Sequence, residues 1–117
     1  MNQDELKKRL KEFALRVIRM YVKLPKDNAV AQVLGRQCLR SATSVGANYI
    51  EATRSRSKAE FIAKTGDSLK EIAETEYWLE LLVESGTVSA DKMVGLIDEV
   101  GQLIAIVTSI NKNAKTN

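Results

Sequence analysis

Residues 4–25 read DELKKRLKEFALRVIRMYVKLP, and this stretch decides the fold. Its apolar side chains recur at alternating steps of four and three residues, which places them in one stripe along an α-helix. The stripe consists of Leu6, Leu10, Phe13, Val17, Met20 and Leu24. The helix ends there because a residue that precedes a proline is displaced from the α region. We therefore predict an amphipathic helix over residues 4–24.

Three further segments carry the same helical period. They are residues 27–54, 58–85 and 90–111. In the second segment, the stripe that we expect in the core consists of Val30, Leu34, Cys38, Val45 and Ala52. Because the connections are short, neighbouring helices must run antiparallel. The sequence thus predicts one all-α domain over residues 1–117, an antiparallel up-down-up-down four-helix bundle.

Residues suited to helix ends mark the boundaries of these segments. The suitable N-caps are Asp27 or Asn28, Ser57 and Ser89. Ser57 also begins an S-x-x-E capping box that Glu60 completes. Gly86 suits the left-handed turn that ends a helix. We expect the polar tail after residue 111 to fray.

The composition argues against an enzyme or a metal protein. The chain has no histidine, which removes the commonest general base and metal ligand. Its single cysteine, Cys38, lies in an apolar helical pattern, where free thiols usually act as inert core residues. Helical di-iron sites pair glutamate with histidine, so the glutamates of the third segment lack that partner. We expect no catalytic residue, cofactor or metal, and an enzyme built on Glu51 and Arg40 is the weakest interpretation.

The sequence also bears on location. No run approaches the roughly 18 apolar residues of a membrane span. The first residues, MNQDE, lack the basic and then apolar regions of a signal peptide. We therefore expect a cytoplasmic protein that does not enter a membrane.

The third segment carries more apolar surface than one bundle core requires, because large apolar side chains cover most of the helix around Tyr77 and Trp78. The second segment has a row of small residues, Gly35, Ala42, Gly46 and Thr53, away from its predicted core stripe. These residues serve either tight packing within one chain or an interface between copies. We expect a homo-oligomer. The candidate interface residues are Leu39, Gly46, Ile50, Tyr77, Trp78 and Leu81.

Basic residues are concentrated in the first half of the chain, whereas the third segment is acidic. The candidate nucleic-acid-binding residues are Lys8, Arg9, Arg16, Arg19, Lys23, Arg36, Arg40, Arg54, Arg56 and Lys58. Such stripes suit a phosphate backbone, since lysine and arginine release counterions when they neutralise phosphates. The competing interpretation is a solvated face with salt bridges to the acidic third helix.

A polar row also follows the second segment at heptad-like spacing. It consists of Gln37, Ser41, Ser44, Asn48 and Glu51. Buried polar groups need hydrogen-bond partners, so the row suits a network that fixes helix register. The alternative is a ligand pocket formed by Arg40, Asn48 and Glu51.

Several of these residues recur in one known pattern. Arg40, Ser44, Asn48 and Glu51, then Arg54, Ser57 with Glu60 and Phe61, and ETEYWLELL at residues 74–82 lie within residues 37–82. Together they resemble the bacterial four-helix-bundle family encoded by intervening sequences in 23S ribosomal RNA genes. The resemblance implies a homopentamer, similar also to accessory proteins of diversity-generating retroelements, which bind nucleic acid and a reverse transcriptase.

These observations predict a non-enzymatic, oligomeric bundle that binds the phosphate backbone of RNA or DNA. The residues available for base stacking are already needed for packing, so we expect backbone contacts rather than base readout. The alternative is a protein-interaction scaffold that docks another protein, such as a polymerase or reverse transcriptase.

Overall fold

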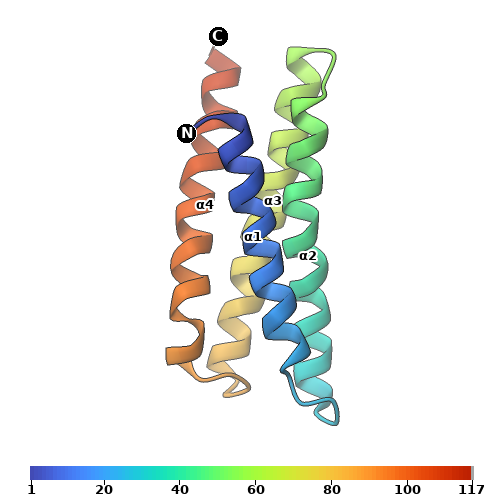
Figure 1. Ribbon diagram of the computed structural model, residues 1–117, viewed down its shortest axis with the longest axis vertical. Coiled ribbons are helices and arrows are strands. Elements are labelled where there is room, and N and C mark those ends of the chain that lie inside the picture. The colour runs from blue at the N-terminus through green and yellow to red at the C-terminus, as the bar shows by residue number, and fades with distance from the viewer. Residues whose placement is uncertain (117) are drawn as a thin grey trace.

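The computed structural model describes residues 1–116, which form four α-helices joined by short turns (Figure 1). The helices are α1 (Gln3–Val22), α2 (Ala29–Thr53), α3 (Lys58–Glu84) and α4 (Ala90–Thr116). Successive helices run in opposite directions in a bundle that measures 48 × 21 × 20 Å. The predicted all-α, up-down-up-down fold is therefore confirmed.

The helix starts follow the predicted capping chemistry. The side chain of Asn28 accepts a hydrogen bond from the Ala31 amide at 3.0 Å, and Ser57 accepts one from Glu60 at 3.1 Å. The Glu60 carboxylate accepts from the Arg56 amide, so this helix start has a variant of the predicted capping box. Ser89 directly precedes the first residue of α4, as predicted.

One helix end was predicted correctly and one was not. Gly86 has φ +76°, and the turn around it includes a hydrogen bond from the Val88 amide to the Leu82 carbonyl. The predicted fraying after residue 111 is wrong, because α4 continues to Thr116. The buried Asn111 amide donates to the Ile62 carbonyl at 3.0 Å and to the Thr65 hydroxyl at 2.9 Å, which ties the last turns of α4 to α3.

The core contains the α1 stripe as predicted, but in the first turns of α2 other residues than the predicted ones face the core. Val30 is 52% exposed, so its predicted place in the core is wrong. Ala31 and Gly35 are buried instead. A methyl group on Gly35 would lie 2.5 Å from Leu24 Cδ1, and one on Gly46 would lie 3.7 Å from Leu10 Cβ. Gly35 therefore admits α1 of the same chain. A methyl group at Gly46 would lie at an ordinary contact distance, and the part of Gly46 in an interface between copies stays a prediction.

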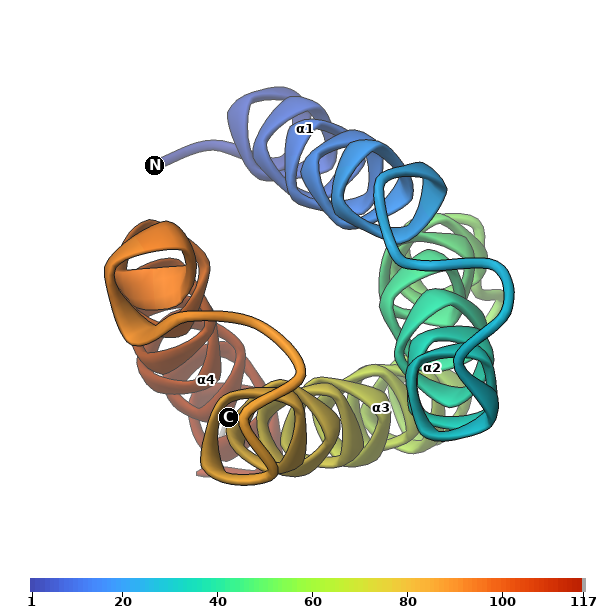
Figure 2. The ribbon, with the colours of Figure 1, turned by 90° about the horizontal axis from the view of Figure 1, so that it is seen from below.

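The helices pack in chain order, and α1 and α4 contact each other least (Figure 2). The turn between α1 and α2 and the turn between α3 and α4 lie at the same end of the bundle, the lower end in Figure 1. The seam between α1 and α4 is therefore the least tightly packed of the four seams between neighbouring helices.

Helix α4 is long and apolar enough to cross a membrane by length and composition alone. The expectation that no segment approaches those values does not hold for α4. The core helix of a bundle meets the same test, and one face of α4, which includes Met93, Val100 and Val107, is buried against the other helices. That the protein does not enter a membrane stays a prediction.

Candidate functional site

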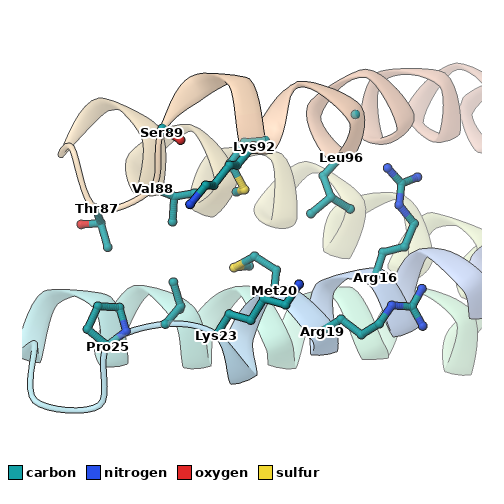
Figure 3. Close-up of a pocket in the computed structure, with 13 residues that line it drawn as sticks. Arg16, Arg19, Met20, Lys23, Pro25, Thr87, Val88, Ser89, Lys92 and Leu96 are labelled. Carbon is teal, nitrogen blue, oxygen red and sulfur yellow. The ribbon is translucent and has the colours of Figure 1, made fainter.

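A groove of about 780 Å³ lies between the second half of α1 and the start of α4 (Figure 3). Its cationic lining residues are Arg16, Arg19, Lys23 and Lys92. Its apolar lining residues are Met20, Leu24, Pro25, Val88, Met93 and Leu96. Cations thus surround an apolar floor, and three of the predicted basic residues come together here.

Every charged residue that lines the groove is a cation. Arg19 forms an ion pair with Glu12 at 2.8 Å. Within residues 1–116, Arg16, Lys23 and Lys92 form no ion pair. Arg16 of α1 and Lys92 of α4 lie on opposite walls of the groove, with the Lys92 ammonium beside Val88 and the Arg16 guanidinium beyond Leu96 (Figure 3). Because these charges are uncompensated by acids in the lining, the groove attracts anions.

The absence of a side chain at Gly95 gives the Arg16 guanidinium room beside α4. A methyl group at Gly95 would lie 3.0 Å from Arg16 Nη2. A glycine inside a helix costs about 0.5–1 kcal/mol relative to alanine, and here it lets a cation from α1 lie close to the α4 backbone.

A second α1–α4 contact lies on the same seam, nearer the other end of the bundle. Arg9 donates two hydrogen bonds to the Glu99 carboxylate, each of 2.8 Å, and one to Gln102 at 2.7 Å. The hydrogen bonds from Arg9 hold the pKa of the Glu99 carboxyl below its usual value, and the charge of Arg16 acts in the same direction. Arg9, a predicted nucleic-acid contact, is thus engaged within the chain.

The Arg9–Glu99 pair makes stability depend on pH. Because folding lowers the pKa of Glu99, its contribution is present above the unfolded value near 4.5 and is lost as the pH falls through the folded value. We expect Glu99→Gln to be less stable than the wild type at neutral pH, with a difference that shrinks below about pH 4.5. Urea denaturation over this range measures the difference. An equal difference at every pH would contradict the role assigned to this carboxylate.

The other predicted basic residues are distributed over different surfaces. Arg40 donates to Glu74 at 2.8 Å and to Glu71 at 3.4 Å. Arg40 therefore forms the salt bridges to α3 that the competing interpretation of the basic residues describes. Lys8 and Arg36 are exposed on α1 and α2. The remaining candidates, Arg54, Arg56 and Lys58, lie at the turn between α2 and α3. The candidate nucleic-acid-binding residues of α1 and α2 therefore do not form one continuous basic surface.

Two glutamates of α3 are engaged by one cation. Glu71 and Glu74 both contact Arg40. In the part of the chain that the structure describes, no three acidic or thiol side chains are placed to hold a metal ion.

The polar row of α2 makes separate hydrogen bonds rather than converging on one pocket. Ser41 bonds the Thr75 hydroxyl of α3 at 2.7 Å, and both residues are buried. Ser44 and Asn48 donate to carbonyls one turn earlier in α2. Glu51 pairs with Lys64 at 2.8 Å, and Gln37 is exposed. The row thus joins α2 to α3 at Ser41 and at Glu51, and that it fixes the helix register stays a prediction.

The predicted interface residues are only partly covered by their own chain. Tyr77 is 55% exposed and lies edge-on to Trp78, with 5.3 Å between ring centroids. Both line a shallow hollow with Gln37 and Arg40. The Trp78 indole nitrogen is buried and has no hydrogen-bond partner among the described residues. Ile50 is 37% exposed, whereas Leu39 and Leu81 are half-buried.

Sequence reasoning missed two kinds of surface residue. Lys92 lines the groove, although the fourth segment showed no excess of basic residues. Further large apolar side chains are exposed, among them Val22, Val30, Val33 and Val94. Lys92 lies near the start of α4. Its place beside the α1 cations of the groove is seen only once α1 and α4 are packed side by side.

Cys38 is unsuited to nucleophilic chemistry. The side chain is fully buried, and burial raises the pKa of its thiol to about 12. Because the thiolate is the reactive form, we expect an aromatic disulfide reagent to modify the native protein at least about 1,000-fold more slowly than the urea-unfolded chain. Absorbance of the released thiolate follows the reaction. Equal rates in the two states would contradict the assigned burial.

Most of the chain matches one known protein family. The family model of 23S rRNA-intervening sequence proteins matches residues 3–109. The chain belongs to this family. The resemblance inferred from residues 37–82 is therefore confirmed, and it extends over nearly the whole chain.

A protein of known structure has the same fold. The crystal structure of a protein with unknown function from the S23 ribosomal protein family of Bacteroides thetaiotaomicron is 35% identical to this chain. The match covers 96% of this chain and 99% of that one, with a TM-score of 0.85. No curated protein matches the chain.

Proposed function

We propose that this protein is a non-enzymatic, oligomeric bundle that binds the phosphate backbone of RNA or DNA through the groove between α1 and α4. The observation that carries the proposal is the lining of that groove, where Arg16, Arg19, Lys23 and Lys92 are the only charged residues. Clustered cations suit phosphates, and no acid lies in the lining itself, although Arg19 also pairs with Glu12 outside it.

A non-enzymatic role is supported by the state of the residues that could carry chemistry. Cys38 is buried with a raised pKa, and Glu51 is bonded to Lys64. Arg40 is held by Glu71 and Glu74. None of these groups lies in the groove lining.

We propose self-association, with the pentamer implied by the family resemblance, on the basis of exposed apolar side chains. Tyr77 is 55% exposed and Val94 65% exposed, on different helices. Copies arranged in a ring would multiply the four groove cations into an extended basic surface. Light scattering coupled to gel filtration tests this: we expect a mass about five times the 13.0 kDa of one chain. A mass of one chain at micromolar concentration would reject self-association.

A second candidate function, a protein-interaction scaffold, is favoured by the hollow beside Tyr77 and Trp78. An exposed aromatic ring next to Arg40 has the composition of an interface centre. Affinity capture from native host extract with wild type and Tyr77→Ser separates this function from self-association. A partner retained by both proteins would show that the hollow does not dock it.

Nucleic-acid binding is tested by fluorescence anisotropy with labelled RNA and DNA of equal length, single- and double-stranded. We expect saturable binding at low salt that weakens steeply as salt is raised, because phosphate contacts release counterions. Absence of binding to all four ligands at low salt would reject the proposal.

A further inference from the structure

The cations of the α1–α4 groove are spread along its length. The Lys92 ammonium lies beside Val88, whereas the Arg16 guanidinium lies beyond Leu96 (Figure 3). Because these two charges lie toward opposite ends of the groove, one small anion does not contact both. The arrangement therefore suits a long ligand that carries several separate negative charges.

The cations of the α1 wall are spaced as on one face of a helix. Arg16, Arg19 and Lys23 are three and four residues apart, which corresponds to rises of about 4.5 and 6 Å. One turn of a second helix rises about 5.4 Å, so carboxylates one turn apart on that helix can each lie opposite one of these cations. Residues on one side of an extended strand repeat about every 6.6 Å and match less well. Arg19 already pairs with Glu12, but both side chains are more than half exposed, and such pairs contribute little.

The floor between the cations is apolar and contains methionine. The chain has three methionines, and the two beyond Met1, which are Met20 and Met93, both line the groove. Met20 is half-buried, whereas Met93 is 1% exposed. Methionine is flexible and polarizable, and it is common on surfaces that bind amphipathic helices of varied sequence. The floor therefore indicates a ligand with apolar anchor residues, which a phosphate backbone lacks.

The α1–α4 seam is the position on the bundle where a further helix can pack. Among the four seams between neighbouring helices, α1 and α4 contact each other least. On α1 the cationic lining extends from Arg16 to Lys23, which is two helical turns or about 10 Å. A docked helix of about three turns covers this length and presents apolar anchors to the floor at steps of three and four residues.

We propose that the α1–α4 groove is the docking site of an acidic amphipathic helix of a partner protein. Apolar side chains of that helix pack on Met20 and Val88, and its carboxylates lie against Arg16, Lys23 and Lys92. No acid in the lining opposes them. Because the proposed function places nucleic acid on the same cations, the partner and nucleic acid exclude each other. That exclusion rests on the proposed function, whereas the docking site does not.

Two labelled peptides of one composition test the docking site. Each has about 16 residues of alanine, leucine and glutamate, a length at which an isolated helix begins to form. In the first peptide the leucines recur at steps of three and four beside the glutamates, and in the second the same residues are reordered so that no apolar stripe forms. We expect the amphipathic peptide to bind the full chain at least about 10-fold more tightly in fluorescence anisotropy, because only this peptide covers the floor.

Matched variants place the peptide in the groove. Met20→Gln with Val88→Thr keeps the side-chain sizes but makes the floor polar, and should weaken amphipathic-peptide binding at least about 5-fold. RNA affinity should change less than about 2-fold, because a phosphate backbone needs only the cations. Val30→Thr with Val33→Thr makes a similar change at exposed residues of α2 outside the lining and should leave both affinities unchanged. Circular dichroism and thermal unfolding check that each variant keeps its fold.

The outcomes separate this inference from the proposed function. Equal binding of the two peptides, or peptide binding that the polar floor does not weaken, would overturn the docking site and leave nucleic-acid binding in place. Floor-dependent peptide binding by a protein that binds no oligonucleotide would support the docking site and reject the proposed function. Where both ligands bind, the amphipathic peptide should displace labelled RNA. A polar floor that weakens RNA binding as much as peptide binding would overturn the assignment of the floor to a protein partner in favour of nucleic acid.

Discussion

Reversal of three groove charges, in the variant Arg16→Glu with Lys23→Glu and Lys92→Glu, is expected to lower RNA affinity about 100-fold at about 0.1 M salt. Each lost contact to a single strand removes about 0.7 from the slope of log affinity against log salt. At that salt concentration this amounts to about 5-fold for each contact. The slope itself should fall by about 2. Anisotropy titrations at several salt concentrations measure both quantities.

A control with the same change in net charge distinguishes the groove from general electrostatics. Lys70→Glu with Lys112→Glu and Lys115→Glu alters three exposed lysines on α3 and α4 outside the groove. Because remote charges act mainly through long-range steering, this variant should lose less than about 10-fold. An equal loss in both variants would mean that the groove has no special part in binding.

Phe13→Ala is expected to be the most damaging single truncation in the groove-forming helix. Phe13 is 1% exposed in the centre of the α1 stripe, and truncation of a buried phenylalanine costs about 3–5 kcal/mol. Because whole domains are stable by about 5–15 kcal/mol, this loss should lower the urea midpoint greatly. The prediction is checked by urea denaturation followed by circular dichroism.

Leu15 gives a matched comparison on the opposite side of the same helix. It is 38% exposed, so Leu15→Ala should cost about 1 kcal/mol or less in an isolated chain. A loss for Leu15→Ala as large as that for Phe13→Ala would contradict the assignment of the core face of α1. A loss for Leu15→Ala that grows with protein concentration would place Leu15 in an interface between copies.

The α1 stripe was predictable because its apolar residues keep one strict helical period and its end is marked by Pro25. The α2 stripe was predictable only in part. Large apolar residues such as Val30 suggested the core, but burial in the first turns of α2 is decided by the close approach of α1. That approach requires Gly35, whose added methyl group would meet Leu24. The spacing of apolar residues predicts which side of a helix is apolar. It does not predict how closely a neighbouring helix approaches, which decides the burial of small residues such as Gly35.

The groove was beyond sequence reasoning for a different reason. The basic stripe of α1 was found from its spacing, but the groove also needs Lys92 from α4, and the bridge from Arg9 to Glu99 lies on the same seam. These residues are about 70 to 90 positions from their α1 partners. Which cations are engaged by acids is likewise a property of the packed bundle, as Arg40 illustrates.

The central claim is that nucleic acid occupies the α1–α4 groove, and lysine footprinting tests it most directly. The protein is acetylated with and without a saturating RNA, and the modified lysines are quantified by mass spectrometry. The account predicts strong protection of Lys23 and Lys92, the two lysines of the groove, and little change at Lys112 or Lys115. Unchanged modification of Lys23 and Lys92 while bound RNA protects lysines elsewhere would contradict it.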